Sequence, residues 1–277
     1  MTNWPQQARC AVTMTVHFDA ETLWTSKDER NSRRPVTLSQ GRFGAARGVD
    51  ALLGLLESEA LRTTFFVPGA VAQRYPEVVG RILSGGHALG HHGYAHERLQ
   101  PEDSSKEEEF LRRGLEALQS VASVRPRGYA APGWVFTPDT VDLLAKYGFD
   151  YSVNMMDDVH PYVHHVAGGA EIVELPVHWL LDDAPFRLGG TDHAKPVSSG
   201  EQMLQIWLEE FRGIYEVGGL FNLTLHPQVS GRPSMVQVLR RLLAELRAYP
   251  GVWFATCEQL CDFVQESVDF RQAPASP

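Results

Sequence analysis

Three histidines fall within six residues in the segment GHHGYAHE, residues 90–97. Imidazole is a common ligand for transition metals and the usual proton carrier near neutral pH. His92 and His96 are four residues apart, a spacing that on one helical turn places both rings on the same side as a metal clamp. His87 and His91 have the same spacing, but they lie in a strand pattern, where residues four apart are separated by roughly 13 Å. We therefore predict His92 and His96 as metal ligands and His91 as a hydrogen-bonded structural residue.

Two other predicted strands also end in side chains that can bind a metal or transfer a proton. In CAVTMTVHFD (10–19), alternation places His17 and Asp19 on the same face at the end of the strand. Asp19 offers an anionic third ligand, and a His₂Asp set leaves open positions for water and substrate, as catalytic zinc sites do. The segment LFNLTLH (220–226) ends at His226. The predicted cofactor is one divalent metal ion, with zinc favoured among several metals that take similar ligands.

Alternating β-branched runs and amphipathic stretches must position these side chains. Strands are expected at 10–19, 62–68, 87–92, 126–131, 151–155, 171–179, 220–226 and 251–256, and helices near 44–59, 70–84, 102–121, 138–147, 201–216, 234–248 and 257–266. This alternation predicts a parallel sheet, and seven or eight strands favour a barrel, whose site lies at the carboxyl ends of the strands. The irregular stretches 20–42 and 180–200 are long enough to be loops that cover the site.

The composition limits the classes of function that the protein can have. The 277 residues carry a net charge of −9, which argues against nucleic acid and anionic membranes as partners. We expect one catalytic domain over 1–277, with a flexible tail at 268–277. Three cysteines, no apolar run of about 18 residues and no signal-peptide pattern predict a reduced, cytoplasmic protein.

Several motifs together resemble the polysaccharide deacetylase superfamily (carbohydrate esterase family 4), in its branch of cytosolic peptidoglycan-deacetylase-like, cyclic-imidase-like and allantoinase-like proteins. The resemblance covers nearly the whole chain. It rests on HFDAETLW (17–24), TTFFVPG (63–69), GHALGHHGYAHE (86–97), GYAAPGW (128–134), ELPVHWLLDDAP (174–185), LTLHPQVSGRP (223–233) and GVWFATCEQL (251–260). It implies a distorted (β/α)₇ barrel and a homotetramer.

The resemblance also assigns roles. The family's metal-binding aspartate falls on Asp19 and its histidine pair on His92 and His96. The late His-Pro motif falls on His226-Pro227, where the family histidine is the general acid to the leaving amine. The implied reaction is attack of a metal-activated water on an amide carbonyl.

Two positions depart from the family pattern. The leading aspartate of the first motif, the family's general base, is His17 here, and an arginine that often holds that aspartate is Ala130. The two changes agree, because an arginine suits a carboxylate and not a histidine. We interpret His17 as a replacement base, since imidazole accepts protons near neutral pH. A fourth metal ligand at His17 and a catalytically weakened binding protein remain as alternatives.

Further candidates lie in the motif loops. Trp24, Trp134 and Trp179 are expected to line a substrate pocket, because aromatic walls orient planar or sugar substrates. Asp182 and Asp183 are expected to support His226 from behind. Glu21 is a substitute base or ligand, and Glu97 is expected to orient a ligand histidine.

The predicted function is metal-dependent hydrolysis of a non-peptide carbon–nitrogen bond. The expected substrate is a small amide, imide or ureide. The alternatives are a polysaccharide or peptidoglycan N-deacetylase, with an amino-sugar substrate, and the weakened binding protein.

Overall fold

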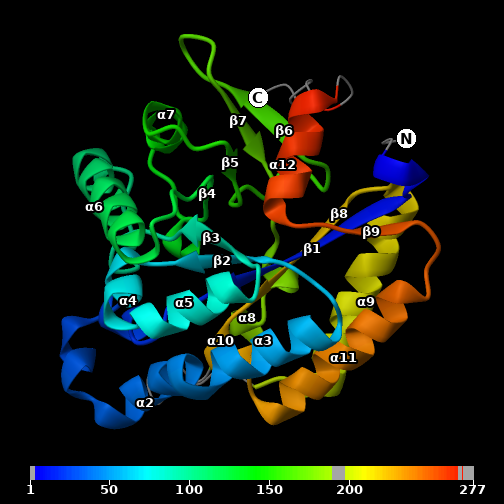
Figure 1. Ribbon diagram of the computed structural model, residues 1–277, viewed down its shortest axis with the longest axis horizontal. Helices are drawn as coiled ribbons and strands as arrows, with labels where there is room; N and C mark the ends of the chain where they lie inside the picture. Colours follow the sequence, from blue (N-terminus) through cyan, green and yellow to red (C-terminus); the bar gives the residue numbers. More distant parts are fainter. Residues whose placement is uncertain (1–3, 189–196, 268–269, 271–277) are drawn as a thin grey trace.

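The computed structural model describes residues 4–188, 197–267 and 270 (Figure 1). One sheet organises the molecule, with the strand order β6-β7-β5-β4-β3-β2-β1-β8, and β9 pairs with the first half of β1. The strands are β1 Cys10–His17, β2 Thr64–Val67, β3 Ala88–His91, β4 Gly128–Tyr129, β5 Tyr151–Ser152, β6 Tyr162–His165, β7 Glu171–Glu174, β8 Leu220–Leu225 and β9 Val252–Phe254. All pairings are parallel except that of β6 with β7.

The sheet closes on itself through an irregular seam. The side-chain amide of Asn222, in β8, donates hydrogen bonds to the carbonyls of Leu175 and Pro176, just after β7. Further along, Thr224 forms a parallel bridge with Asp182. The result is the distorted (β/α)₇ barrel that the sequence predicts, with a segment of loop completing the ring between β7 and β8.

The helices are α1 Thr22–Thr25, α2 Pro35–Phe43, α3 Val49–Ser58, α4 Gly69–Arg74, α5 Pro76–Ser84, α6 Ser104–Ala122, α7 Thr140–Lys146, α8 Ala184–Arg187, α9 Gly200–Val217, α10 Pro227–Ser230, α11 Pro233–Arg247 and α12 Cys257–Glu266. The longer ones cover the outside of the barrel, and the short α1 and α8 lie at its open end. Figure 1 shows α9 and α11 side by side along β1 and β8. No helix in the described part of the chain is long and apolar enough to cross a membrane.

Strand β1 shows how burial fixes the direction of the candidate residues. All eight of its side chains are buried, because helices cover one face and the barrel interior the other. Val12, Met14 and Val16 pack in the core under the helices. The alternate residues therefore face the interior, where the Thr15 hydroxyl lies 3.1 Å from that of Thr224. His17, the last residue of the strand, and Asp19, two residues beyond it, continue this inward row.

Several boundaries differ from the sequence expectations. The stretch 20–42 is not irregular, because α1, the 3-10 helix Glu29–Arg33 and most of α2 lie in it. A π-helical turn, Gly44–Gly48, joins α2 to α3 without a break, so the predicted helix 44–59 begins earlier. The predicted helix 70–84 divides before Pro76, whose ring cannot continue a helix from the preceding turn. Strand β6 was not predicted; it pairs with β7 as an antiparallel hairpin.

Two predicted segments lie partly outside the described residues. Of the stretch 180–200, the structure describes 180–188, which contains α8, and 197–200. Of the tail 268–277 it describes only Phe270, which is buried with its ring 5.3 Å from that of Trp4.

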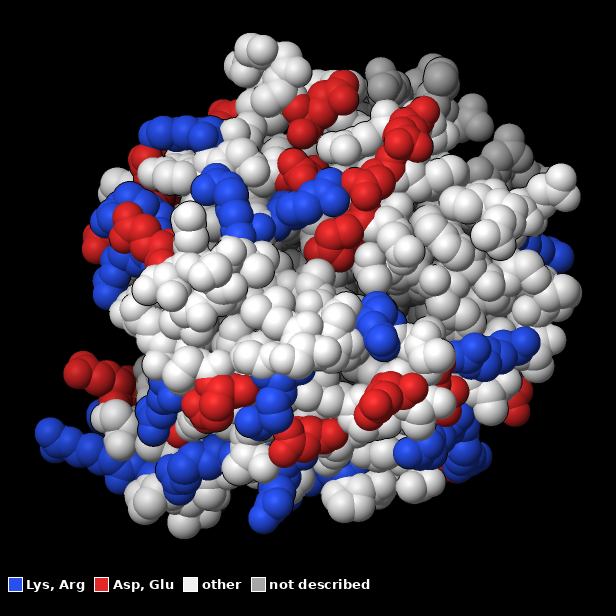
Figure 2. All heavy atoms as spheres, viewed as in Figure 1, with Lys and Arg blue, Asp and Glu red and all other residues white. Residues whose placement is uncertain are grey.

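On the face seen in Figure 2, acidic and basic side chains lie next to one another along the lower edge.

A close backbone contact joins the π-helical turn to α10, the short helix after His226. A β-carbon built on Gly48 would lie 2.1 Å from the Pro227 carbonyl oxygen. We expect Gly48→Ala to lower the free energy of unfolding by about 1–3 kcal/mol, because the two backbones would have to separate. Urea unfolding followed by circular dichroism measures this.

Gly54→Ala is the matched control. Gly54 lies in α3, and a β-carbon there meets no atom within 4 Å. The control is expected to stabilise the protein by up to about 1 kcal/mol through helix propensity. Equal stability of Gly48→Ala and the wild type would contradict the tight packing of α10.

Candidate active site

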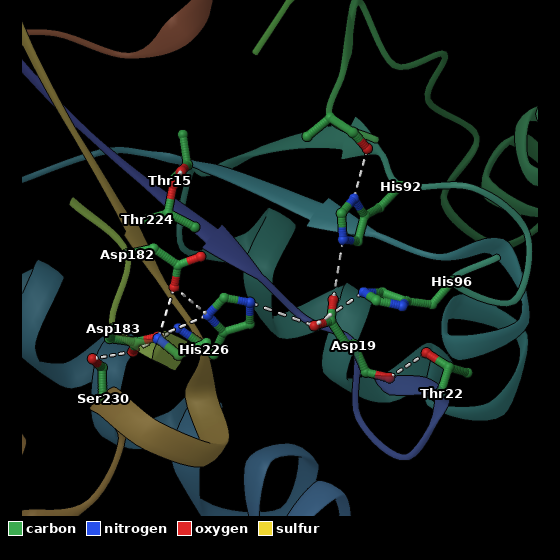
Figure 3. Close-up of polar contacts among 12 residues, drawn as sticks. Thr15, Asp19, Thr22, His92, His96, Asp182, Asp183, Thr224, His226 and Ser230 are labelled. Carbon is green, nitrogen blue, oxygen red and sulfur yellow. Dashed lines mark hydrogen bonds and ion pairs between the residues drawn. The ribbon is translucent and has the colours of Figure 1, made fainter. Parts of the chain in front are cut away.

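Asp19 lies among three imidazoles at the carboxyl ends of the strands (Figure 3). Its Oδ1 is 3.4 Å from His92 Nε2, and its Oδ2 is 3.6 Å from both His96 Nε2 and His226 Nε2. Asp19 and His92 are fully buried, and the other two histidines are nearly so. The structure thus brings together four residues that the sequence places at the ends of β1, β3 and β8.

The far nitrogen of each ring is held by a neighbour. His92 Nδ1 lies 2.6 Å from the Ala130 carbonyl oxygen, so this nitrogen carries the proton and donates it. His96 Nδ1 is 3.3 Å from the Ser26 hydroxyl. Because a carbonyl can only accept, the Ala130 partner fixes the tautomer of His92 and directs the lone pair of its Nε2 at the centre, while the Ser26 contact orients the ring of His96. Burial lowers the pKa of His96 to about 3, so this ring is neutral.

A turn, not a helix, brings His92 and His96 together. Residues 93–95 form the turn, with Gly93 at φ +71° and His96 at φ +61°. The Glu97 carboxylate accepts hydrogen bonds from the backbone N–H groups of Tyr94 (3.0 Å) and Ala95 (2.8 Å). The predicted helical turn was wrong, because left-handed residues and this carboxylate cap reverse the chain directly after β3. Glu97 holds the turn and stays out of the centre.

The loop after Asp19 is similarly constrained. Ala20 has φ +46°, and its backbone lies so close to Gly41 that a β-carbon there would be 2.6 Å away. Glu21 points away from the centre, where it accepts hydrogen bonds from the Tyr75 hydroxyl and pairs with Arg74. The structure therefore does not place Glu21 as a base or ligand. Strain of this kind commonly marks functional sites.

His226 is held from behind by two carboxylates. Its Nδ1 is 2.7 Å from Asp183 Oδ1 and 3.4 Å from Asp182 Oδ1. The other oxygen of Asp183 accepts from the His226 backbone N–H (2.9 Å) and from the Ser230 hydroxyl. Burial favours a lower pKa for His226, but the two carboxylates outweigh it and raise this pKa well above its usual range. The ring is therefore an imidazolium whose Nε2 faces Asp19.

His17 completes the cluster, and its ring is neutral where that of His226 is charged. Its ring centroid is 4.5 Å from that of His92 and 5.3 Å from that of His226. Burial, then the neighbouring His92 and His226, hold the pKa of His17 well below its usual range. The ring is therefore neutral, and its Nε2 is buried without a hydrogen-bond partner among the described residues. Ala130, where the family pattern has arginine, is fully buried in the core, with its carbonyl bound to His92.

Unpartnered polar atoms gather in this centre. Both Asp19 carboxylate oxygens, His92 Nε2 and His17 Nε2 are buried without a hydrogen-bond partner among the described residues. Leaving a buried carboxylate without hydrogen bonds is costly. Burial favours a higher pKa for Asp19, but the facing His96, His92 and His226 lower it below its ordinary value, so it is charged. A buried anion beside two imidazole Nε2 atoms fits a divalent cation, with Asp19, His92 and His96 as its ligands.

A pocket of about 750 Å³ opens over this centre. His17, His96 and His226 form its floor, and the three predicted tryptophans, Trp24, Trp134 and Trp179, all line it. The rings of Trp134 and Trp179 are 4.6 Å apart between centroids, and Trp179 is 46% exposed at the mouth. Sequence reasoning missed the basic residues of the wall, Lys27, Arg30, Arg34 and Arg98. The signal was the charged run KDERNSRR (27–34), which sits inside a predicted covering loop.

The fold and the site define an α/β-barrel protein in which a buried His/Asp centre lies below an open pocket. Barrel enzymes have this layout. Residues 37–152 match the polysaccharide deacetylase family. A solved structure from Mycobacterium smegmatis, named for the same deacetylases, is 37% identical, with a TM-score of 0.95 over 100% of this chain and 97% of that one. The chain belongs to the polysaccharide deacetylase family, whose activity makes it a hydrolase of non-peptide carbon–nitrogen bonds.

Two further proteins are similar to this chain. The peptidoglycan deacetylase of Helicobacter pylori is 28% identical over 255 residues, which cover 82% of this chain and 87% of the relative. The Puue allantoinase structure is 20% identical, with a TM-score of 0.84 over 96% of this chain and 93% of that one. The second likeness concerns the fold alone.

The hydrogen bonds of Asp183 generate a stability prediction. We expect Asp183→Asn to lower the free energy of unfolding by about 1–3 kcal/mol, because the amide NH₂ must face one of three donors. Asp182→Asn is the control, because Asp182 accepts one backbone hydrogen bond, from Ala184 (2.7 Å), and borders the pocket. Urea unfolding of both variants at pH 7 makes the comparison. A larger loss in Asp182→Asn would show that Asp182 is the principal partner of His226.

Proposed function

We propose that this protein is a metal-dependent hydrolase that cleaves a carbon–nitrogen bond in a small amide, imide or ureide. Asp19, His92 and His96 would hold the metal, and zinc is the favoured ion for such a His₂Asp set. The observation that carries the proposal is the group of unpartnered buried atoms on Asp19, His92 and His17 beneath the pocket.

A divalent metal would supply Lewis-acid polarisation of the carbonyl and would lower the pKa of a bound water. The chain's own residues supply the proton transfers. His17, neutral and at the floor of the pocket, accepts a proton from the attacking water. The oxygen of that water forms the new bond to the carbonyl carbon.

His226 acts on the other side of the scissile bond. Its Nδ1 is bound to Asp183 (2.7 Å), so its Nε2 presents a proton to the centre. This proton passes to the leaving nitrogen as the carbon–nitrogen bond breaks. The products are a carboxylic acid and an amine from an amide, an amide from an imide, or a urea from a ureide. The two histidines return to their starting states by exchanging one proton through solvent.

The size of the pocket supports a small substrate. Residues 23–37 and 179–188 both contribute to its wall, so it encloses a volume of about 750 Å³ over the centre. The rings of Trp134 and Trp179, tilted by 56° to one another, each offer an apolar face for the planar part of an amide or imide. The name of the Puue allantoinase agrees with a ureide-type substrate.

A second candidate is N-deacetylation of a polysaccharide or peptidoglycan. It is favoured by the name of the H. pylori relative and by the exposed ring of Trp179, which could stack on a sugar. Turnover of N-acetylglucosamine oligomers, compared with a panel of small amides, imides and ureides, separates the two. Turnover of the oligomers alone would overturn the small-substrate proposal.

The metal is tested by content. We expect about one divalent ion per chain in the purified protein, measured by inductively coupled plasma mass spectrometry, and its loss in His92→Ala or His96→Ala. His165→Ala, a change of an exposed histidine in β6, should keep the ion. Wild-type protein that stays metal-free after incubation with zinc, manganese and nickel salts would contradict the proposed centre.

The base is tested by separating turnover from metal binding. We expect His17→Ala and His17→Gln to lower turnover by roughly 10²–10⁴-fold, because neither side chain accepts the proton of water. Metal content should stay at the wild-type value in both variants. Loss of the metal would instead make His17 a fourth ligand, and near-full activity would exclude it as the base.

A further inference from the structure

Four cationic side chains surround the mouth of the pocket. Lys27, Arg30 and Arg34 come from the segment between α1 and α2, and Arg98 follows the turn that carries His96. The only acidic residues of the wall, within the described residues, are Asp28 and Asp182. Asp28 pairs with Arg30 at 2.7 Å, and Asp182 lies behind His226. The mouth is therefore cationic, although the chain carries a net charge of −9.

Arg98 occupies a distinct place in this ring. Its side chain lies over the backbone of Gly133, where a β-carbon would be 3.6 Å from Nη2. This places the guanidinium beside Gly133, the residue before Trp134, and Arg98 itself is two residues along the chain from His96. Arg98 is exposed, and within the described part of the chain it makes no hydrogen bond or ion pair. Its donors are thus presented at the pocket wall beside the centre.

We propose that the substrate carries a carboxylate or another anionic group, and that Arg98 binds this group while the reacting carbonyl lies at the floor of the pocket. This inference rests on the proposed function and narrows its substrate class to acidic amides, imides or ureides. Guanidinium matches a carboxylate with two parallel hydrogen bonds. Cations around a pocket with low-dielectric walls also concentrate anions at its mouth.

Binding of two matched probes tests the inference without turnover. The probes are succinic acid monohydroxamate and the corresponding carboxamide hydroxamate. Both carry the same metal-chelating hydroxamate, and they differ only in a terminal negative charge. We expect zinc-loaded wild-type protein to bind the charged probe about tenfold more tightly by isothermal titration calorimetry. The preference should shrink as salt rises.

Variants at Arg98 locate the source of the preference. Arg98→Gln should abolish it while leaving the affinity for the neutral probe unchanged, and Arg98→Lys should keep part of it. Arg212→Gln is the control, because it removes one positive charge from α9, where Arg212 contacts Tyr249, and should keep the full preference.

The outcomes separate this inference from the proposed function. If the neutral probe binds and the charged probe binds no more tightly, the inference is wrong and the metal centre stands. A preference that survives Arg98→Gln also overturns the assignment of Arg98. If neither probe binds protein incubated with zinc, the proposed metal centre fails, and the inference fails with it.

Discussion

The buried charge of Asp19 is the constraint on which the site depends. A carboxylate without hydrogen bonds in a barrel interior is tolerated only where positive charge compensates it. Of the surrounding imidazoles, His92 and His96 follow β3 and His226 follows β8, more than a hundred residues further along the chain. Each must arrive with the correct nitrogen facing inward. The Ala130 carbonyl, the Ser26 hydroxyl and Asp183 meet this requirement for His92, His96 and His226.

Local strain and close packing hold these groups at their distances. Ala20, His96 and Trp134 all have positive φ angles, and all three lie at the centre or in the pocket wall. Such conformations are unfavourable for isolated residues, so the surrounding fold must impose them. The backbone of Gly41 against Ala20, and that of Gly48 against Pro227, show how. Helix α2 and the turn that joins it to α3 therefore pack directly against the backbone beside Asp19 and His226 and fix their positions.

Much of the barrel could be predicted because its signals are local. Period-two alternation in residues 10–19 gives both the strand and the shared face of His17 and Asp19, and the same logic places His226 at the end of β8. The His92–His96 turn could not be predicted in its true form. Its geometry depends on a contact from Glu97 to two backbone N–H groups, which spacing alone does not reveal. Likewise, the basic wall depends on where the 20–42 segment folds, and a charged run in sequence does not say which cavity it faces.

The partner of His92 Nδ1 is a main-chain oxygen, and this sets what can vary at position 130. A carbonyl is present whatever side chain the residue carries, so the orientation of His92 survives any substitution there that the packing accepts. The proposed base at position 17 has no such protection, because a group there acts through its side chain. The orientation of His92 is therefore set by the backbone, whereas the group at position 17 changes with its side chain. Different bases at position 17 are therefore compatible with the same proposed metal ligands.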